Sequence, residues 1–465
     1  MTLAKCGAID ASLQMMSSSL QDEYKLSIFS WTSVISACAG CGRSSEALEL
    51  HNLMLTHGVE PDKYTFVSLF KACAKAMNLE EGKRLHDVAG QQRPSVVSDV
   101  FVCNSLISMY GKCGACHEAE EVFLSMPSHT TVSWNAMLTA YLEQKEGKKA
   151  LMLYRQMKEE RGANESILTT VIALQACCAL VENEDLGDMK GQLAMSLEIG
   201  KALHAHAYGR GYTSDIVLGS TLISLYGKCG CLFGAVKAFT DLPMRNVVTW
   251  TAMLSAYAEQ GQIQNALQLY EQMQVFDILP DGHVYVMALK CCMGARDIKR
   301  GKLIHAQIIE NDMESDAFVR NMLIDMHAKL GSLHDAQNLF EKSSLKCDVI
   351  AHGVIIGGYL ENGLPTQAVQ VFGQMQERGV KPDRVIILST LKAISTLECL
   401  HEGRLLHIHI LINGFESEIS VLNTLIDMYV KCGSLEDAKR VFDRSWRLQD
   451  LVTWNVMMSG LVMFR

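Results

Sequence analysis

The chain has 465 residues, of which 49% are hydrophobic and only 7 are proline, so it can bury a large core and is not of the disordered class. Its net charge of −9 argues against a simple basic nucleic-acid binder. No apolar run approaches the roughly 20 residues of a membrane span, and neither a signal peptide nor a transit segment is visible at Met1. We therefore expect no membrane partner.

A nine-residue segment recurs four times along the chain. "LISMYGKCG" begins at residue 106, and close copies begin at residues 222, 323 and 425, which are 116, 101 and 102 residues apart. Trp31, Trp134, Trp250 and Trp454 keep nearly the same period, and His352 occupies the place of the missing tryptophan. A fixed period of this kind indicates a repeat architecture.

Each long period contains helical hairpins. Trp134, Met137, Leu138 and Tyr141 follow the i, i+3, i+4, i+7 spacing of one helix face. The segment "KKALMLYRQMK", after a short polar turn, predicts the second helix. No strand-like alternation competes with this pattern, so we expect an all-α fold in which each hairpin packs on its neighbours.

Turn signals separate the two helices of each hairpin. The glycine of each "KCG" or "KLG" is expected in the left-handed conformation that ends the first helix. Ser434 with Asp437, and Ser332 with Asp335, have capping-box spacing for the second helix. The segments "GVEPD" and "GVKPD" are expected to end a repeat, because proline cannot continue a helix.

Units of 35, 35 and 31 residues, with the signatures "WNAML", "GKRLH" and "LIDMYVKCG", resemble the pentatricopeptide repeats of land plants, in their P, L and S triplet subclass. The resemblance covers essentially the whole chain. It implies a right-handed α-solenoid superhelix of about 13 helix-turn-helix repeats, similar to tetratricopeptide folds. We expect the chain to be truncated at both ends and to lack the C-terminal E/DYW-type extension of this subclass.

The resemblance divides the chain into units, one of which is longer than the others. The excess around "ENEDLGDMKGQLAMS" predicts a surface loop near 182–196, between two helices. The expected units are 1–27 (partial S), 28–62 (P), 63–99 (L), 100–130 (S), 131–166 (P), 167–215 (L), 216–246 (S), 247–281 (P), 282–316 (L), 317–348 (S), 349–383 (P), 384–418 (L), 419–450 (S) and 451–465 (partial P).

The family resemblance implies single-stranded RNA binding, at about one base per repeat. One reading residue, here called the reader, lies in the first turn of the first helix, and a second, here called the closer, ends the repeat. A closing Asp can only accept hydrogen bonds, which suits U and G, whereas Asn or Ser can also donate, which suits C and A. In the family pattern, a reading Asn goes with pyrimidines, and Ser or Thr goes with purines.

The expected reader and closer pairs are Thr32 with Asp62 (G), Asn104 with Thr130 (pyrimidine), Asn135 with Ser166 (C), Ser220 with Asn246 (A), Thr251 with Asp281 (G), Asn321 with Asp348 (U), Gly353 with Asp383 (no base) and Asn423 with Asp450 (U), followed by Asn455 (pyrimidine). In the L units the reader is Val67, Val171, Val286 or Leu388, which cannot bond a base edge. These units are expected to be spacers. The predicted track is 5′-GNYCNAGNUNNUY-3′.

The same residues also have a purely structural interpretation. A closing Asp after proline can be an N-cap worth about 1 kcal/mol, and the two roles can coexist. A first-turn Asn can be an ordinary polar residue. The recurring lysines of the nonamer, Lys112, Lys228, Lys329 and Lys431, either line a groove or are solvated turn residues.

Cysteines and histidines follow the repeat rather than a metal-site pattern. Cys113, Cys229 and Cys432 share a position that Leu330 fills in the fourth copy, so we interpret them as reduced packing residues. One histidine per L unit follows G-[KR]-x-x, and a structural role is expected for each: His86, His204, His305 and His407. We predict no metal and no cofactor.

The zinc deaminase signature H-x-E is absent from the chain, so we predict no enzymatic activity. Any C-to-U editing would need editing-factor proteins in trans. We therefore expect an RNA specificity factor in organellar editing or processing, in the mitochondrion or the chloroplast, with the mitochondrion slightly favoured and no DNA binding. The alternative is a protein-binding scaffold of the tetratricopeptide type.

Overall fold

The computed structural model describes residues 9–14, 26–92, 94–160, 165–182, 189–342, 349–445 and 448–463. Within these ranges all regular structure is helical, which confirms the all-α prediction. None of the described helices is both long enough and apolar enough to cross a membrane. The chain forms two compact units, with the boundary between Gln260 and Gly261.

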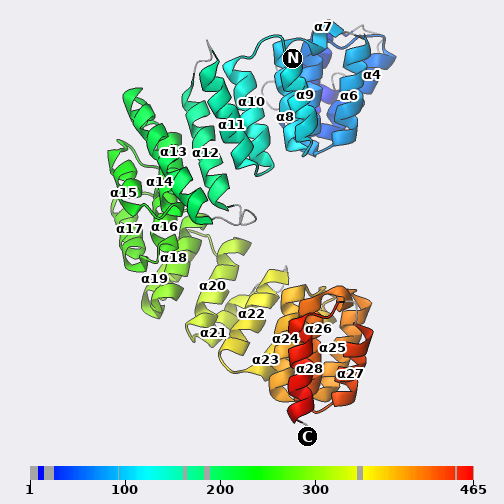
Figure 1. The fold of residues 1–465 in the computed structure, drawn as a ribbon, viewed down its shortest axis with the longest axis vertical. Coiled ribbons are helices and arrows are strands. Elements are labelled where there is room, and N and C mark those ends of the chain that lie inside the picture. The colour runs from blue at the N-terminus through cyan, green and yellow to red at the C-terminus, as the bar shows by residue number, and fades with distance from the viewer. Residues whose placement is uncertain are drawn as a thin grey trace. The chain divides into compact units, whose positions relative to one another are not determined.

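The first unit, Met1–Gln260, is a series of helical hairpins (Figure 1). Its helices are α3 (Ile28–Gly40), α4 (Ser44–Thr56), α5 (Lys63–Ala76), α6 (Leu79–Gln92), α7 (Pro94–Val97), α8 (Val100–Lys112), α9 (Cys116–Ser125), α10 (Thr131–Glu143), α11 (Gly147–Glu159), α12 (Ile167–Glu182), α13 (Met189–Gly209), η2 (Tyr212–Ser214), α14 (Ile216–Lys228), α15 (Leu232–Asp241) and α16 (Val247–Glu259).

The second unit, Gly261–Arg465, continues the same alternation of helices. Its helices are α17 (Ile263–Val275), α18 (Gly282–Ala295), α19 (Ile298–Glu310), α20 (Ala317–Lys329), α21 (Leu333–Lys342), α22 (Val349–Glu361), α23 (Pro365–Glu377), α24 (Arg384–Leu397), α25 (Leu400–Ile412), η3 (Phe415–Ser417), α26 (Ile419–Lys431), α27 (Leu435–Arg444) and α28 (Leu451–Met463).

The first helices of successive repeats form one layer within each unit. In the first unit α3, α5, α8, α10, α12, α14 and α16 contact one another in that order, and in the second α18, α20, α22, α24, α26 and α28 do the same. The second helices other than α17 pack on the first helix of their own repeat, as α9 does on α8 and α15 on α14. The second helices therefore form the other layer of each unit.

The expected turn chemistry is present at the helix ends. Gly114, Gly230, Gly331 and Gly433 have φ angles of 72° to 82°, the left-handed conformation that only glycine adopts without strain. The capping box predicted at Ser434 is wrong, because its side chain makes no cap hydrogen bond. Its hydroxyl instead donates to the Asp437 carboxylate, at 2.8 Å.

The G-[KR]-x-x-H motif of the L units is explained by packing. A Cβ added at Gly82 would lie 2.5 Å from the sulfur of Met109, and the equivalent glycines Gly200, Gly301 and Gly403 face Leu225, Met326 and Met428 in the same way. The histidine of the motif then reaches the next first helix. The His86 ring bonds the Tyr110 hydroxyl at 2.8 Å, and His204 with Tyr226 and His407 with Tyr429 repeat this contact. The structural role predicted for these histidines is confirmed.

The fourth copy of this contact joins two imidazoles. His305 Nδ1 lies 3.0 Å from Nε2 of His327, which stands where the other nonamers have tyrosine. Burial lowers the pKa of both rings, and that of His327 falls to about 4. Both imidazoles are therefore held neutral near pH 7.

Trp134 and Trp250 are buried against a phenylalanine of the preceding second helix. Trp134 meets Phe123 edge to face, with ring centroids 5.0 Å apart, and Trp250 meets Phe239 at 5.1 Å. His352 takes the tryptophan position and packs on Phe340 at 5.0 Å. The substitution therefore preserves an aromatic contact of the same geometry.

The long L unit differs from its prediction. Residues 183–188 of the expected surface loop lie outside the described residues, but residues 189–196 form the first two turns of α13. That segment, "MKGQLAMS", consists mainly of good helix formers. Ser196 is fully buried. Part of the predicted loop is thus an N-terminal extension of a packed helix.

The cysteines of the nonamer occupy helix C-caps. Cys113, Cys229 and Cys432 end their helices, and Leu330 ends α20 in the same way. Burial raises the pKa of the Cys229 thiol to about 11, so it is protonated near neutral pH. A leucine can replace such a thiol because the position only requires an apolar side chain. The packing role predicted for these cysteines is supported.

Candidate nucleic-acid interface

The closers predicted from the sequence begin the helices of the following repeats. Asp62, Asp383 and Asp450 each accept a backbone N–H through Oδ1, at 2.8, 2.9 and 2.8 Å. The remaining closers cap their helices in the same manner: Thr130, Ser166, Asn246 and Asp281. The N-cap interpretation is therefore confirmed. In each capping aspartate, Oδ2 bonds no described residue, so capping and base reading do not compete for the same oxygen.

The readers share one helical register. Every predicted reader falls on the fifth position of its helix, here called N5, both where a side chain caps the helix and in α26, where Glu418 makes no cap hydrogen bond. The N5 residues are Thr32, Val67, Asn104, Asn135, Val171, Ser220, Thr251, Val286, Asn321, Gly353, Leu388, Asn423 and Asn455. Asp348, the predicted partner of Asn321, lies outside the described residues.

The polar readers differ in their local hydrogen bonds. Asn135 is only 9% exposed, and its Oδ1 accepts from the Thr169 hydroxyl at 2.8 Å. Ser220 instead donates to its own helix, at the Val217 carbonyl. Asn104 Oδ1 is buried and accepts no hydrogen bond from the described residues.

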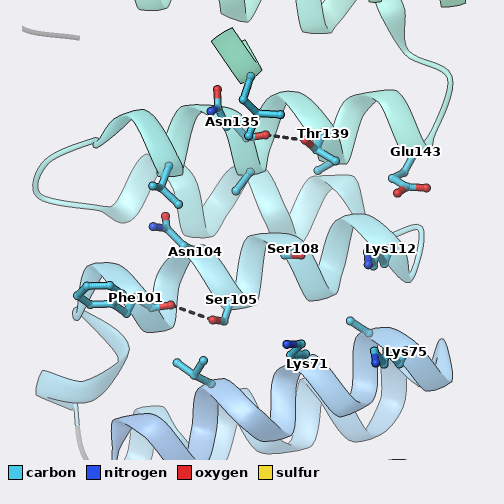
Figure 2. Close-up of a pocket in the computed structure, with 16 residues that line it drawn as sticks. Lys71, Lys75, Phe101, Asn104, Ser105, Ser108, Lys112, Asn135, Thr139 and Glu143 are labelled. Carbon is cyan, nitrogen blue, oxygen red and sulfur yellow. Dashed lines mark hydrogen bonds between the residues drawn. The ribbon is translucent and has the colours of Figure 1, made fainter. Parts of the chain in front are cut away.

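A groove of about 520 Å³ brings the readers of three repeats together in the first unit. It lies along α5, α8 and α10 and contains the readers Val67, Asn104 and Asn135. Figure 2 shows Asn104, Ser105, Ser108 and Lys112 along one helix of this groove and Asn135, Thr139 and Glu143 along the next. The predicted reading positions therefore share one surface.

The same groove is locally basic. Three of its lining residues, here called the groove lysines, carry positive charge: Lys71, Lys75 and Lys112. Glu143 is the one carboxylate among the lining residues. The charge of these lining residues thus differs in sign from the net charge of the whole chain.

The second unit has a groove of similar construction, with a volume of about 540 Å³. It contains the reader Asn423 together with Lys392, Asp427 and Lys431. Lys392 occupies the ninth position of α24, the position that Lys71 occupies in α5. The arrangement of a reader beside basic residues is therefore repeated.

The four nonamer lysines do not behave alike. Lys112 makes no ion pair with any described residue and lines the first groove. Lys228 pairs with Glu182, Lys329 with Asp325 at 3.0 Å, and Lys431 with Asp427 at 2.6 Å. Three of the four are therefore partly neutralised by carboxylates, and the groove interpretation fits Lys112 best.

An exposed apolar row adjoins the readers, and the sequence reasoning missed it. It occupies the second helical position, here called N2, one turn before N5 on the same helix face. Each member is more than half exposed, and Phe101 is 70% exposed. The row consists of Phe29, Tyr64, Phe101, Val132, Leu168, Val217, Val248, Phe318, Ile350, Val385 and Val452. Its sequence signal is an apolar residue three places before eleven of the thirteen readers, with His283 and Ser420 at the other two places.

Two aromatic pairs stand out at the N2 positions, and the second includes His283, which is not a member of the apolar row. Lys63 Nζ lies 5.4 Å from the ring centre of Tyr64 and 5.9 Å from that of Phe101, so it lies near both rings. In the second unit, His283 and Phe318 occupy the corresponding positions, with ring centroids 6.0 Å apart. Exposed aromatic rings next to hydrogen-bonding side chains are typical platforms for unstacked bases.

Comparisons with known proteins give one consistent result. The PPR repeat family model matches residues 26–75, 129–179 and 245–294, and the PPR repeat model matches 101–129, 220–247, 318–343, 350–380 and 420–448. Together these matches cover more than half of the chain.

Two curated relatives are pentatricopeptide repeat-containing proteins of Arabidopsis thaliana. One is 30% identical over 97% of this chain and 52% of its own length, and the other is 32% identical over 94% and 64%. The chain thus spans between about half and two thirds of their length. Other Arabidopsis relatives carry "chloroplastic" or "mitochondrial" in their names.

The solved structure of the maize pentatricopeptide repeat protein PPR10 shares the fold. It aligns with a TM-score of 0.60 and 19% identity, over 96% of this chain and 68% of that one.

Proposed function

The chain belongs to the pentatricopeptide repeat family, and on that premise we propose that it binds single-stranded RNA along the N5 face of its first helices. The observation that carries this proposal is the meeting of three features in the groove along α5, α8 and α10. Polar readers at N5, exposed apolar residues at N2 and the groove lysines line that one surface. A nucleotide presents a base edge, a base face and a phosphate. The polar readers suit the edge, the apolar residues suit the face and the lysines suit the phosphate.

Each P or S repeat would hold one base between the apolar row and its reader. The N2 side chain offers the flat apolar contact, and the N5 side chain together with the closer bonds the Watson–Crick edge. The L units, with valine or leucine at N5, would hold a base without reading it. The predicted track 5′-GNYCNAGNUNNUY-3′ follows from these pairs.

We propose an address function for this RNA-binding surface. The chain would direct RNA processing or C-to-U editing that partner proteins carry out in trans. The organellar names of several relatives support an organellar location for this chain, and the mitochondrion remains the preferred choice.

The test is a competition titration of the chain with RNA of the predicted track against a scrambled RNA of the same composition. The substitution Thr32→Asn changes a G-type pair into a U-type pair with Asp62. It is expected to move the preference at that one position from G to U and to leave the other positions unchanged.

Thr240→Asn is the matched control, because Thr240 is exposed on the second helix α15, away from the N5 face. It should alter no preference. Equal binding of the two RNAs by folded wild-type protein would refute the proposed register and would favour a protein-binding scaffold instead.

A further inference from the structure

The residue at the third position of the next helix, here called N3, connects the two reading residues of several repeats. Thr169 lies between the reader Asn135 and the closer Ser166, at 2.8 and 2.9 Å. Thr65 lies between Thr32 and Asp62, at 2.7 and 2.8 Å. Reader and closer are therefore joined through one hydroxyl.

The third example is in the second unit. The Thr453 hydroxyl lies 2.6 Å from Oδ1 of the reader Asn423 and 2.8 Å from Oδ1 of the closer Asp450. The amide of Asn423 also approaches the same carboxylate oxygen, at 3.3 Å. The same three-part contact thus occurs in three repeats and in both units.

The direction of the hydrogen bonds depends on the closer. A hydroxyl has one hydrogen to donate. Thr169 gives its hydrogen to Asn135 Oδ1, so the Ser166 hydroxyl must donate to Thr169. This bond engages one lone pair of Asn135 Oδ1 and fixes the amide, so that the Asn135 NH₂ group is left to face a base as a donor.

With an aspartate as closer the direction is reversed. Asp62 can only accept, so Thr65 donates to it and the Thr32 hydroxyl donates to Thr65. The free lone pairs of Thr32 are then left as acceptors for a base. In these two repeats the N3 hydroxyl therefore passes the donor or acceptor character of the closer on to the reader. At Thr453 both contacts are acceptors, Asn423 Oδ1 and Asp450 Oδ1, which share the single hydroxyl hydrogen.

Other repeats of this chain lack the contact and serve as internal comparisons. The Thr249 hydroxyl donates to the Asn246 carbonyl at 2.7 Å, and the nearby reader Ser220 bonds its own helix. Ile386 occupies N3 beside Gly353, and neither residue offers a polar side-chain atom. The N3 contact is thus a property of particular repeats and not of the fold.

We propose that Thr65, Thr169 and Thr453 are positioning residues that set which hydrogen-bonding group the reader presents to RNA. N3 then acts as a third determinant of base preference. This inference rests on the proposed RNA-binding function and deepens it. At Asn135, a fixed NH₂ donor suits the ring N3 acceptor of cytosine and opposes the N3–H donor of uracil. Without the Thr169 hydroxyl, the amide can turn and accept from uracil.

The experiment measures the ratio of the dissociation constants for RNAs with C or U at the Asn135 repeat. Thr169→Val keeps the branched shape and removes the hydroxyl, and it is expected to reduce the preference for C by about fivefold, the worth of one net hydrogen bond. Thr169→Ser keeps a hydroxyl and should retain the preference.

Thr249→Val is the matched control, since it removes an N3 hydroxyl that touches no reader. It should lower the melting temperature by an amount similar to Thr169→Val and leave the A-over-G ratio at the Ser220 repeat unchanged. If Thr169→Val keeps the full preference for C, or if Thr249→Val loses selectivity equally, the positioning role is overturned. A wild-type chain without any C preference overturns the proposed function together with this inference.

A measurement without RNA tests the contact itself. Melting temperatures of Asn135→Ala, Thr169→Val and the double variant are compared with that of the wild type. The hydrogen bond predicts a non-additive double variant, because either single change already removes it. Strictly additive shifts would show that the two side chains are not coupled and would overturn the inference.

Discussion

The contact between α8 and α10 holds a glycine against an alanine, and exchanging these two residues gives a stringent test of the packing. A Cβ added at Gly111 would lie 2.5 Å from the Cβ of Ala140 and 2.8 Å from its Cα. The same positions of later repeats carry Gly227 with Ala256, Ala328 with Gly358, and Val430 with Gly460. One partner of each pair is always glycine, but which partner it is changes along the chain.

The expected magnitudes follow from this geometry. Gly111→Ala forces two backbones apart at a cost of about 1–3 kcal/mol, which the better helix propensity of alanine offsets by about 1 kcal/mol. Ala140→Gly loses a buried methyl group and helix propensity, together about 2 kcal/mol. The double variant reproduces the order found at Ala328 and Gly358, so its cost should be close to zero.

The assay is urea unfolding followed by circular dichroism, combined with hydrogen exchange of α8 and α10 to localise the change. Each single variant should unfold at lower urea than the wild type, and the double variant should recover most of the loss. The coupling between the two sites is then about 3 kcal/mol. If the loss of stability in the double variant equals the sum of the losses in the two single variants, the close backbone approach is not the reason that one residue of the pair must be glycine.

Three further predictions concern pH, salt and stacking. The pKa of His327 falls from 6.5 to about 4 on folding, so the stability that its neutral form provides is complete above pH 6.5 and falls by about 3 kcal/mol as the pH drops toward 4. His327→Tyr should flatten the curve of unfolding free energy against pH in this range, and parallel curves for both proteins would contradict the argument. Changing all three groove lysines to glutamine should reduce the slope of log affinity against log salt by about 2, because each phosphate contact on single-stranded RNA contributes about 0.7. An unchanged slope would show that the RNA phosphates do not contact these lysines. Phe101→Ala should weaken binding by about 1–3 kcal/mol whatever base lies at that repeat, while Leu124→Ala, at a site 75% exposed on α9 and outside the groove, should leave the affinity unchanged.

Much of the fold could be predicted from the sequence because its determinants are local. The period of the nonamer, the helical spacing around Trp134 and the left-handed glycines each depend on residues within one or two turns. The closers were predictable as N-caps for the same reason, since Asp62 and Ser166 bond residues only three places away. The helix starts in turn set the N5 register of the readers.

Local signals were insufficient where neighbouring residues compete. The spacing of Ser434 and Asp437 fits a capping box, yet the hydroxyl bonds the carboxylate directly. The extra residues of the long L unit resembled a loop, but a run of helix formers there extends α13. In both cases the sequence pattern was present, but the residues form a different local structure: a direct side-chain hydrogen bond in the first case and a longer helix in the second.

The finer features of the candidate site were decided by tertiary structure alone. Thr169 meets Asn135 across 34 residues, and Thr453 meets Asn423 across 30. His305 and His327 are 22 residues apart. Nothing in the sequence near any one of these residues specifies its partner. The stacking of one hairpin on the next brings these partners within hydrogen-bonding distance. The sequence by itself thus determined the helical position of each predicted reader. Only the packing of successive helices decided which hydrogen-bonding group a predicted reader can present.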